Sequence, residues 1–215
     1  MGGIHSGTSK QKTISFLAYH ERQQQSLCGL HVVNNLLQRH AFTRFSLNRL
    51  ARKLDKAERR LIDKRKRNAV LHFLTGGRAG WRLDARNCSA RGDFSVQVLQ
   101  AALQSEGLDL VRVTDTDWAS RIGESWGFLV HRDDHWLACR QIGDHSIWLN
   151  LDSTLAAPLI MSTDEVIALH AGLSSRGGRM TVFNVVGPTP PSPYRRFFCG
   201  PVQKLRVNVP ADTVL

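Results

Sequence analysis

The chain has 215 residues, of which 42% are hydrophobic and 22% are charged, and its formal net charge is +11. This composition excludes an intrinsically disordered chain, and it allows one domain with a sizeable core. No apolar run approaches the roughly 20 residues that a membrane-spanning helix needs. The N-terminus also lacks the continuous apolar stretch of a secretory signal.

The cysteines are widely spaced and form no C-x-x-C pair, a pattern that suits neither a disulfide framework nor a zinc site. They are Cys28, Cys88, Cys139 and Cys199. We therefore expect a reducing compartment, the cytoplasm, with the nucleus or a membrane surface as alternatives. No metal or other cofactor is expected, because the histidines show no metal-ligand spacing.

The first half of the chain reads as helical. Residues 1–15 are rich in Gly, Ser, Thr and Lys and predict a flexible tail. Apolar residues at helical spacing predict a helix over 26–39 with Ser26 as its N-cap. A second helix is expected after Ser46, and a more polar helical stretch over 56–74.

Much of the positive charge lies within residues 49–67, which end in Lys64-Arg65-Lys66-Arg67. Such a run is most often the solvated face of a helix, and it can also attract RNA, anionic lipid or an import receptor. We interpret residues 52–90 as a variable basic helical arm.

One more helix is predicted before Gly107, and from there the hydrophobic period changes from helical to strand-like. Asp93 or Ser95 is suited to cap this helix, which Gly107 ends, and residues 163–173 predict a later helix. The predicted strands are 108–113, 126–130, 136–142, 147–151 and 180–186. Helices followed by mostly antiparallel strands indicate the α+β class.

Residues 188–193 read PTPPSP, which cannot continue a sheet. We therefore predict a Pro-rich C-terminal tail over 188–215, and a catalytic domain over 16–187.

Cys28 is the candidate nucleophile. It lies in the first turn of the predicted helix, where unpaired N–H groups and the helix dipole favour a thiolate. Gln23, five residues upstream, can join the Cys28 N–H in binding an oxyanion. His31 lies one helical turn from Cys28 on the same face, too close for a good base geometry, and is expected to pack beside the site.

A predicted hairpin supplies the base. If Gly143 and Asp144 form a tight turn, antiparallel pairing places His135 directly opposite Asp152 on one face. With a longer loop Asp152 shifts along the strand but keeps its face. A carboxylate beside the imidazole gives the oriented base that a thiol nucleophile requires.

The same residues resemble the Josephin family of deubiquitinating cysteine proteases, most closely its small Josephin-only members. The resemblance covers residues 17–186. Its motifs are 19–23 (YHERQ), 26–28 (SLC) with His31, 34–38 (NNLLQ), 92–99 (GDFSVQVL), 134–136 (DHW) and 148–153 (WLNLDS).

The resemblance implies a papain-like fold, in which a helical part carrying Cys28 packs on a sheet carrying the base. It also implies a Cys28–His135–Asp152 triad with Gln23 as the oxyanion residue. The implied substrates are ubiquitin, polyubiquitin chains and ubiquitinated proteins, cleaved through a thioester. Residues 52–90 depart from the family pattern in being longer and more basic.

Three alternatives stay open. A ubiquitin-binding module without turnover would keep the same residues. A nucleic-acid-binding function is disfavoured, because no known motif accompanies the basic run. The N-terminal sequence Met1-Gly2-Gly3-Ile4-His5-Ser6 matches the N-myristoylation pattern, which would bring the chain to an anionic membrane.

Overall fold

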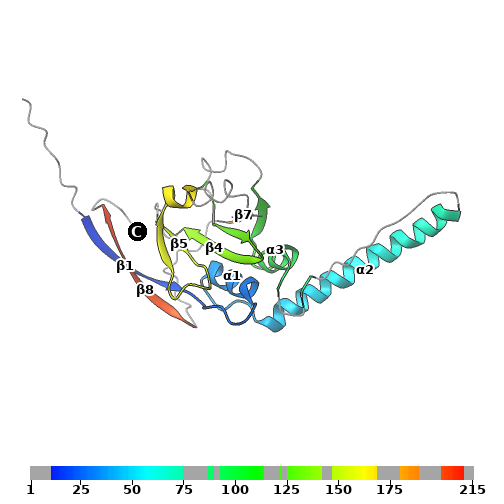
Figure 1. The fold of residues 1–215 in the computed structure, drawn as a ribbon, viewed down its shortest axis with the longest axis horizontal. Helices are drawn as coiled ribbons and strands as arrows, with labels where there is room; N and C mark the ends of the chain where they lie inside the picture. Colours follow the sequence, from blue (N-terminus) through cyan, green and yellow to red (C-terminus); the bar gives the residue numbers. More distant parts are fainter. Residues whose placement is uncertain are drawn as a thin grey trace, which may run out of the picture.

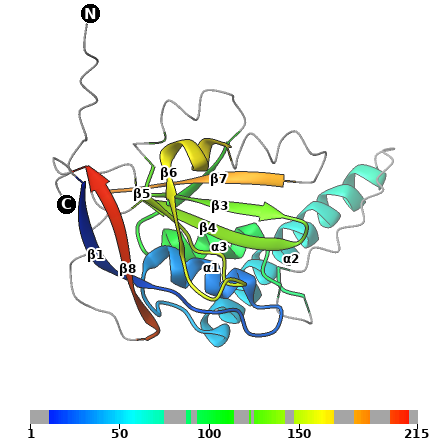
Figure 2. The same cartoon turned by 60° about the vertical axis from the view of Figure 1, so that its left-hand side comes forward.

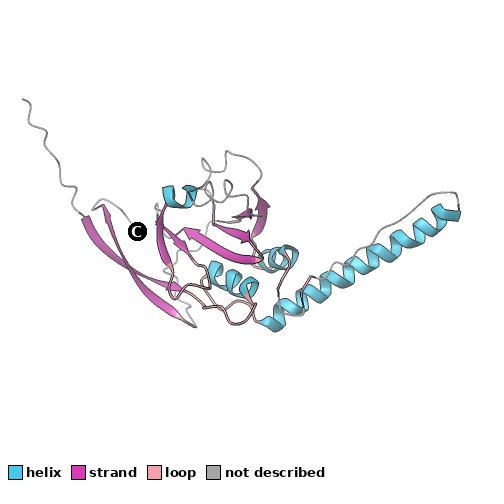
Figure 3. Cartoon of the chain, viewed as in Figure 1, coloured by secondary structure: helices cyan, strands magenta, loops and turns pink. Residues whose placement is uncertain are grey.

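The computed structural model describes residues 11–74, 87–89, 93–113, 122, 125–141, 147–168, 180–188 and 200–210, with the backbone alone for 11, 62–74, 209 and 210. Within these residues a six-stranded sheet carries two short helices on one face, a long helix projects from the body, and a separate pair of strands lies beside it (Figures 1 and 3). The helices are α1 (Cys28–Leu37), α2 (Arg44–Leu74) and α3 (Val96–Gln104).

Every pair of neighbouring strands in the main sheet is antiparallel, and the order is β2-β7-β3-β4-β5-β6. The strands are β2 (Asp109–Arg112), β3 (Gly127–Arg132), β4 (His135–Gln141), β5 (Ile147–Asn150), β6 (Leu159–Ser162) and β7 (Met180–Val186). Five of these match strands predicted from the sequence. β6 was not predicted, and the expected helix after it is helical over 163–168, beyond which it lies outside the described residues.

The central strands are buried on both faces, so they read as continuous apolar runs. Leu129 packs with the helices in the main core. Its neighbours Phe128 and Val130 point to the opposite face, where they join a second apolar cluster. There the rings of Phe128 and Trp148 stack with their centroids 5.4 Å apart.

α1 packs on β4 and also contacts α3, beneath the sheet in Figure 2. A buried arginine ties the end of α1 to the sheet. The Arg140 guanidinium donates a hydrogen bond to the carbonyl of Leu36 and lies 4.2 Å from the centre of the Trp126 ring. The carbonyls of a last helical turn lack partners within the helix, which makes this a favourable position for a cation.

The two helical stretches predicted after Ser46 form one helix, α2. It begins with reciprocal hydrogen bonds, in which the Thr43 N–H donates to Ser46 Oγ and the Ser46 N–H donates to Thr43 Oγ1. Asp55 and Glu58 accept hydrogen bonds from Asn87, so these acidic side chains face the body. The exposed cations of its described part are Arg44, Arg49, Arg52, Lys53, Lys56, Arg59 and Arg60. No described helix is long and apolar enough to cross a membrane.

The structure corrects both predicted tails. Strand β1 (Gln11–Tyr19) pairs along its full length with β8 (Val202–Pro210), so residues 11–15 and 202–210 are parts of a sheet. The physical reason is an alternating pattern, since Ile14 and Phe16 point into the main core opposite Val207 and Leu205. The two ends of the chain therefore cover one flank of the core.

Candidate active site

Cys28 is the first residue of α1, and it follows a tight loop. Leu27 is the N-cap residue, which corrects the expectation that Ser26 would cap the helix. The loop turns at Gln25, whose φ of 54° lies in the left-handed region that residues other than glycine rarely adopt. Cys28 is buried, with 4% of its surface exposed, and its backbone N–H lies at the electropositive end of the helix.

His135 is positioned by a two-residue hairpin turn. Asp133 and Asp134 both have positive φ, as a type I′ turn requires, and Arg132 pairs with His135 across it. Short acidic side chains tolerate this conformation better than most. The turn places His135 at the first position of β4, at the edge of the helical layer where α1 begins.

His135 and Asp152 lie in direct contact. The Nε2 atom of His135 is 2.8 Å from the Oδ1 atom of Asp152. Their predicted register was wrong by two residues, because Cys139 lies opposite Asn150 and the β4–β5 ladder ends at the pair Gln141–Trp148. A shift of two residues preserves the face of a strand, and the contact survives as a diagonal one.

Thr154 also fixes the carboxylate of Asp152, at the same oxygen that contacts His135. Both the backbone N–H and the hydroxyl of Thr154 donate to Oδ1, at 2.9 and 2.8 Å. Burial raises the pKa of Asp152, but the hydrogen bonds from His135 and Thr154 outweigh it and leave that pKa lowered. Asp152 is therefore ionised at neutral pH and can stabilise a cationic imidazole.

His135 also contacts Cys28, the candidate nucleophile. The hydrogen bond with Asp152, then that with Cys28, raises the pKa of His135 to about 9. Since Nε2 faces Asp152, the Nδ1 atom is the one left for the sulfur. An imidazole between a carboxylate and a thiol is placed to exchange a proton with that sulfur. The three predicted triad residues are thus brought together.

Gln23 lies beside the same loop. Its backbone N–H donates to the Ser153 carbonyl at 2.7 Å, and its Oε1 accepts from the Ser153 hydroxyl at 3.2 Å. The side-chain amide donates to the carbonyl of Gln25 at 2.8 Å. An amide nitrogen carries two hydrogens, so this bond uses one of the two that an oxyanion site could draw on.

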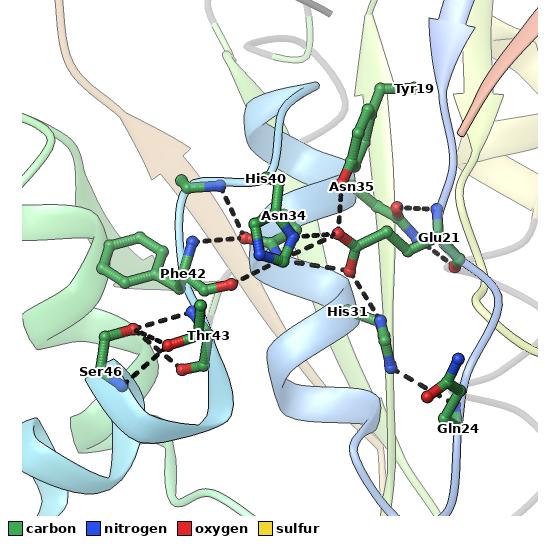
Figure 4. Close-up of polar contacts among 11 residues, drawn as sticks. Tyr19, Glu21, Gln24, His31, Asn34, Asn35, His40, Phe42, Thr43 and Ser46 are labelled. Carbon is green, nitrogen blue, oxygen red and sulfur yellow. Dashed lines mark hydrogen bonds and ion pairs between the residues drawn. The ribbon is translucent and has the colours of Figure 1, made fainter. Parts of the chain in front are cut away.

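A buried carboxylate holds the loop before Cys28 in place (Figure 4). Glu21 accepts hydrogen bonds from His31 Nδ1 at 2.7 Å, from His40 Nδ1 at 2.8 Å, from the Asn34 amide at 3.2 Å and from the Tyr19 hydroxyl. Burial raises the pKa of Glu21, but these donors lower it to about 2.

His31 is held within this network. While Nδ1 donates to Glu21, Nε2 accepts from the backbone N–H of Gln24 at 3.3 Å. Both ring nitrogens are therefore engaged away from Cys28, which agrees with the prediction that His31 packs beside the site and is not its base (Figure 4).

Sequence reasoning missed the roles of Glu21 and Thr154. Each had a local signal: Glu21 lies two residues before Gln23, and an Asp followed two residues later by Thr is typical of a turn in which the carboxylate accepts backbone and hydroxyl hydrogens. Among the described residues, no group of three or more His, Cys, Asp and Glu side chains is close enough to hold a metal ion.

The Josephin family model matches residues 23–184, about three quarters of the chain. The chain belongs to the Josephin family. The match contains Gln23, Cys28, His135 and Asp152, and leaves out β1 and β8. The helical part on an antiparallel sheet is thus the α+β, papain-like fold that the resemblance implied.

Several curated proteins are similar to this Josephin chain. A putative ataxin-3 homolog of Oryza sativa subsp. japonica is 33% identical over 181 residues, which cover 81% of this chain and 51% of the relative. An ataxin-3 homolog of Arabidopsis thaliana is 34% identical, covering 81% and 60%, and ataxin-3 of Gallus gallus is 30% identical, covering 80% and 46%. The chain spans about half the length of the curated relatives it matches.

Proposed function

We propose that the chain is a cysteine-type deubiquitinase, which hydrolyses the isopeptide bond between the C-terminal glycine of ubiquitin and a lysine. The observation that carries this proposal is the position of His135, hydrogen-bonded to both Cys28 and Asp152. The substrate class rests on membership of the Josephin family. The proposed partners are ubiquitin, polyubiquitin chains and ubiquitinated proteins.

The proposed reaction passes through a thioester. The Cys28 sulfur attacks the glycine carbonyl carbon, and the Cys28 N–H and the Gln23 amide bind the negative oxygen that forms. The protonated His135 gives its proton to the lysine nitrogen as the carbon–nitrogen bond breaks. Water then attacks the thioester, His135 takes its proton, and ubiquitin leaves as a carboxylic acid while the thiolate is restored.

The electrostatics of the site support this order of events. With its pKa raised to about 9, His135 carries the proton that the leaving amine needs at neutral pH. Asp152, held by Thr154, fixes the imidazole so that its other nitrogen faces the sulfur.

Two observations favour a second candidate, a ubiquitin-binding module without catalytic turnover. Cys28 is only 4% exposed, and the Gln23 amide is bonded to its own loop. A site that stays in this state would bind ubiquitin without attacking it.

The test is labelling by ubiquitin that carries an electrophile at its C-terminus. We expect a covalent adduct on wild-type protein and none on Cys28→Ser. A small alkylating reagent serves as a control for access to the sulfur. Alkylation of Cys28 without any ubiquitin adduct, in protein that still binds ubiquitin, would establish the binding module instead.

An acyl chain on Gly2 is a separate proposal that rests on the N-terminal motif alone, which lies outside the described residues. One such chain gives only marginal membrane binding, so Lys10 and Lys12 would have to contribute. Intact mass of protein from its native source tests it, since an unmodified Gly2 contradicts the idea. We propose the cytoplasm or nucleus as its location, because four widely spaced cysteines form no disulfide framework, as is usual in a reducing compartment.

A further inference from the structure

The strand pair β1–β8 ends at the active site, although it lies outside the region that matches the family. β1 runs directly into His20, whose backbone N–H donates to the carbonyl of Pro201 at 3.0 Å. Pro201 is the residue before β8. The C-terminal strand therefore holds the backbone at the start of the loop that leads to Cys28.

The side chain of His20 reaches the third triad residue. Its Nε2 atom lies 3.0 Å from the backbone carbonyl of Asp152. A carbonyl can only accept, so Nε2 carries the hydrogen. The same carbonyl accepts from the Leu155 N–H at 3.1 Å. His20 thus fixes the main chain of Asp152, while Thr154 fixes its carboxylate.

Packing alone does not explain a histidine here. The residue is 1% exposed, and within the part of the chain that the structure describes its Nδ1 atom is buried without a hydrogen-bond partner. A buried polar atom without a partner is destabilising, so an apolar side chain would fill the same space at lower cost. The bond to Asp152 is what the imidazole adds.

Gly200 lets the C-terminal segment approach this closely. Its φ of 142° suits glycine, and a Cβ atom there would lie 2.6 Å from Cε2 of the Tyr19 ring. The Tyr19 hydroxyl in turn donates to Glu21. Gly200 therefore lies against Tyr19, and Pro201 lies against His20, where β1 leads into the loop before Cys28.

We infer that His20 is a positioning residue for Asp152, and that β8, by holding His20, completes the catalytic site of the proposed deubiquitinase. The C-terminal strand then contributes to the geometry of the active site. The inference rests on the proposed function for its activity readout, and on the geometry alone for its spectroscopic one.

The first test compares His20→Met, which keeps the volume and loses the donor, with His20→Gln, whose amide can replace the Nε2 hydrogen. The readout is the NMR titration of the His135 ring, assigned with His135→Gln. Asp152 and Cys28 act on the pKa of this ring, and the charge of His135 in turn acts on His131. The charged groups acting on His20 are Asp152, Arg22 and Glu21.

We expect the midpoint of His135 to fall by about one pH unit in His20→Met and to stay near its wild-type value in His20→Gln. With a ubiquitin substrate, kcat should fall about tenfold in His20→Met with KM unchanged, and should recover in His20→Gln. A folded His20→Met protein with the wild-type midpoint and kcat overturns the inference.

The second test acts from the strand and needs no change at His20. Gly200→Val pushes on the Tyr19 ring and should lower the His135 midpoint in the same direction. Lys204→Thr, at an exposed position of β8, should not move it. An unshifted midpoint in Gly200→Val refutes the role of β8.

The titration separates the two hypotheses. Should no variant or wild type react with the ubiquitin probe while the midpoint still shifts in His20→Met, the proposed function fails and the positioning role stands. Should the wild type react while the midpoint stays in place, the positioning role fails by itself.

Discussion

The Nε2 atom of His135 lies 2.8 Å from the Oδ1 atom of Asp152, and Thr154 donates two further hydrogen bonds to that same oxygen. The carboxylate is thus anchored before it meets the imidazole. This arrangement resists rotation of the Asp152 side chain, so the direction of the imidazole is set by the backbone of the turn after β5.

Asp152→Asn should therefore keep the geometry and lose the charge. We expect kcat to fall about tenfold and the pKa of His135 to drop toward its ordinary value, because a neutral amide stabilises the imidazolium less. Asp152→Ala, which removes the acceptor, should cost about a hundredfold. Steady-state kinetics of the two variants checks the order, and equal losses would contradict it.

The pH profile follows from the state of His135. Because the imidazole must be protonated to release the amine, we expect kcat to decline as the pH rises through about 9, the raised pKa of His135.

The free energy of unfolding should also decrease as the pH rises. The contribution of the His135 pair is complete below pH 6.5 and is lost between there and about 9. Kinetics and urea unfolding across this range are the measurements. Asp152→Asn is the control, in which the decline of kcat and the loss of stability should both move to lower pH.

Part of this site could be predicted from the sequence and part could not. Helical spacing is sufficient to place Cys28 in the first turn of α1, because a helix face is a local property. The partnership of His135 with Asp152 survived an incorrect register, since a shift of two residues leaves both side chains on one face. Their distance along the strands, however, depends on the register of β4 and β5, which no local rule gives.

The contacts that hold the candidate triad from neighbouring segments could not be predicted from the sequence. His20 meets Asp152, and Pro201 meets His20, across long separations along the chain. The alternation of Ile14 and Phe16 in β1 was visible, but a strand needs a partner, and its partner lies near the other end of the chain. Pairing of such distant segments carries no local signal.

Protonation of Glu21 should account for much of the stability that the protein loses in acid. All four of its side-chain partners donate to it, so in Glu21→Gln the new NH2 group would face donors. Its lowered pKa contributes stability that is complete above pH 4.5 and is lost as the pH falls to about 2, on the order of 3 kcal/mol. We expect Glu21→Gln to lose about that much at pH 7 and to show a flatter acid limb.

The measurement for Glu21 is urea unfolding at several pH values. Glu106→Gln is the matched control, since Glu106 pairs with Arg39 at the surface, where an ion pair contributes little. Equal losses in both variants at pH 7 would show that the buried network has no special weight.

The strand pair β1–β8 should unfold with the rest of the domain. Phe16 is 5% exposed and lies opposite Leu205 in the ladder, so Phe16→Ala should lower the free energy of unfolding by about 3 kcal/mol. Ser15→Ala, at an exposed neighbouring position, should change it by less than about 0.5 kcal/mol. Urea unfolding followed by both fluorescence and hydrogen exchange at β8 gives the test. A β8 that exchanges freely while the main sheet stays protected would mean that the ends of the chain are docked loosely, and Phe16→Ala would then have little effect.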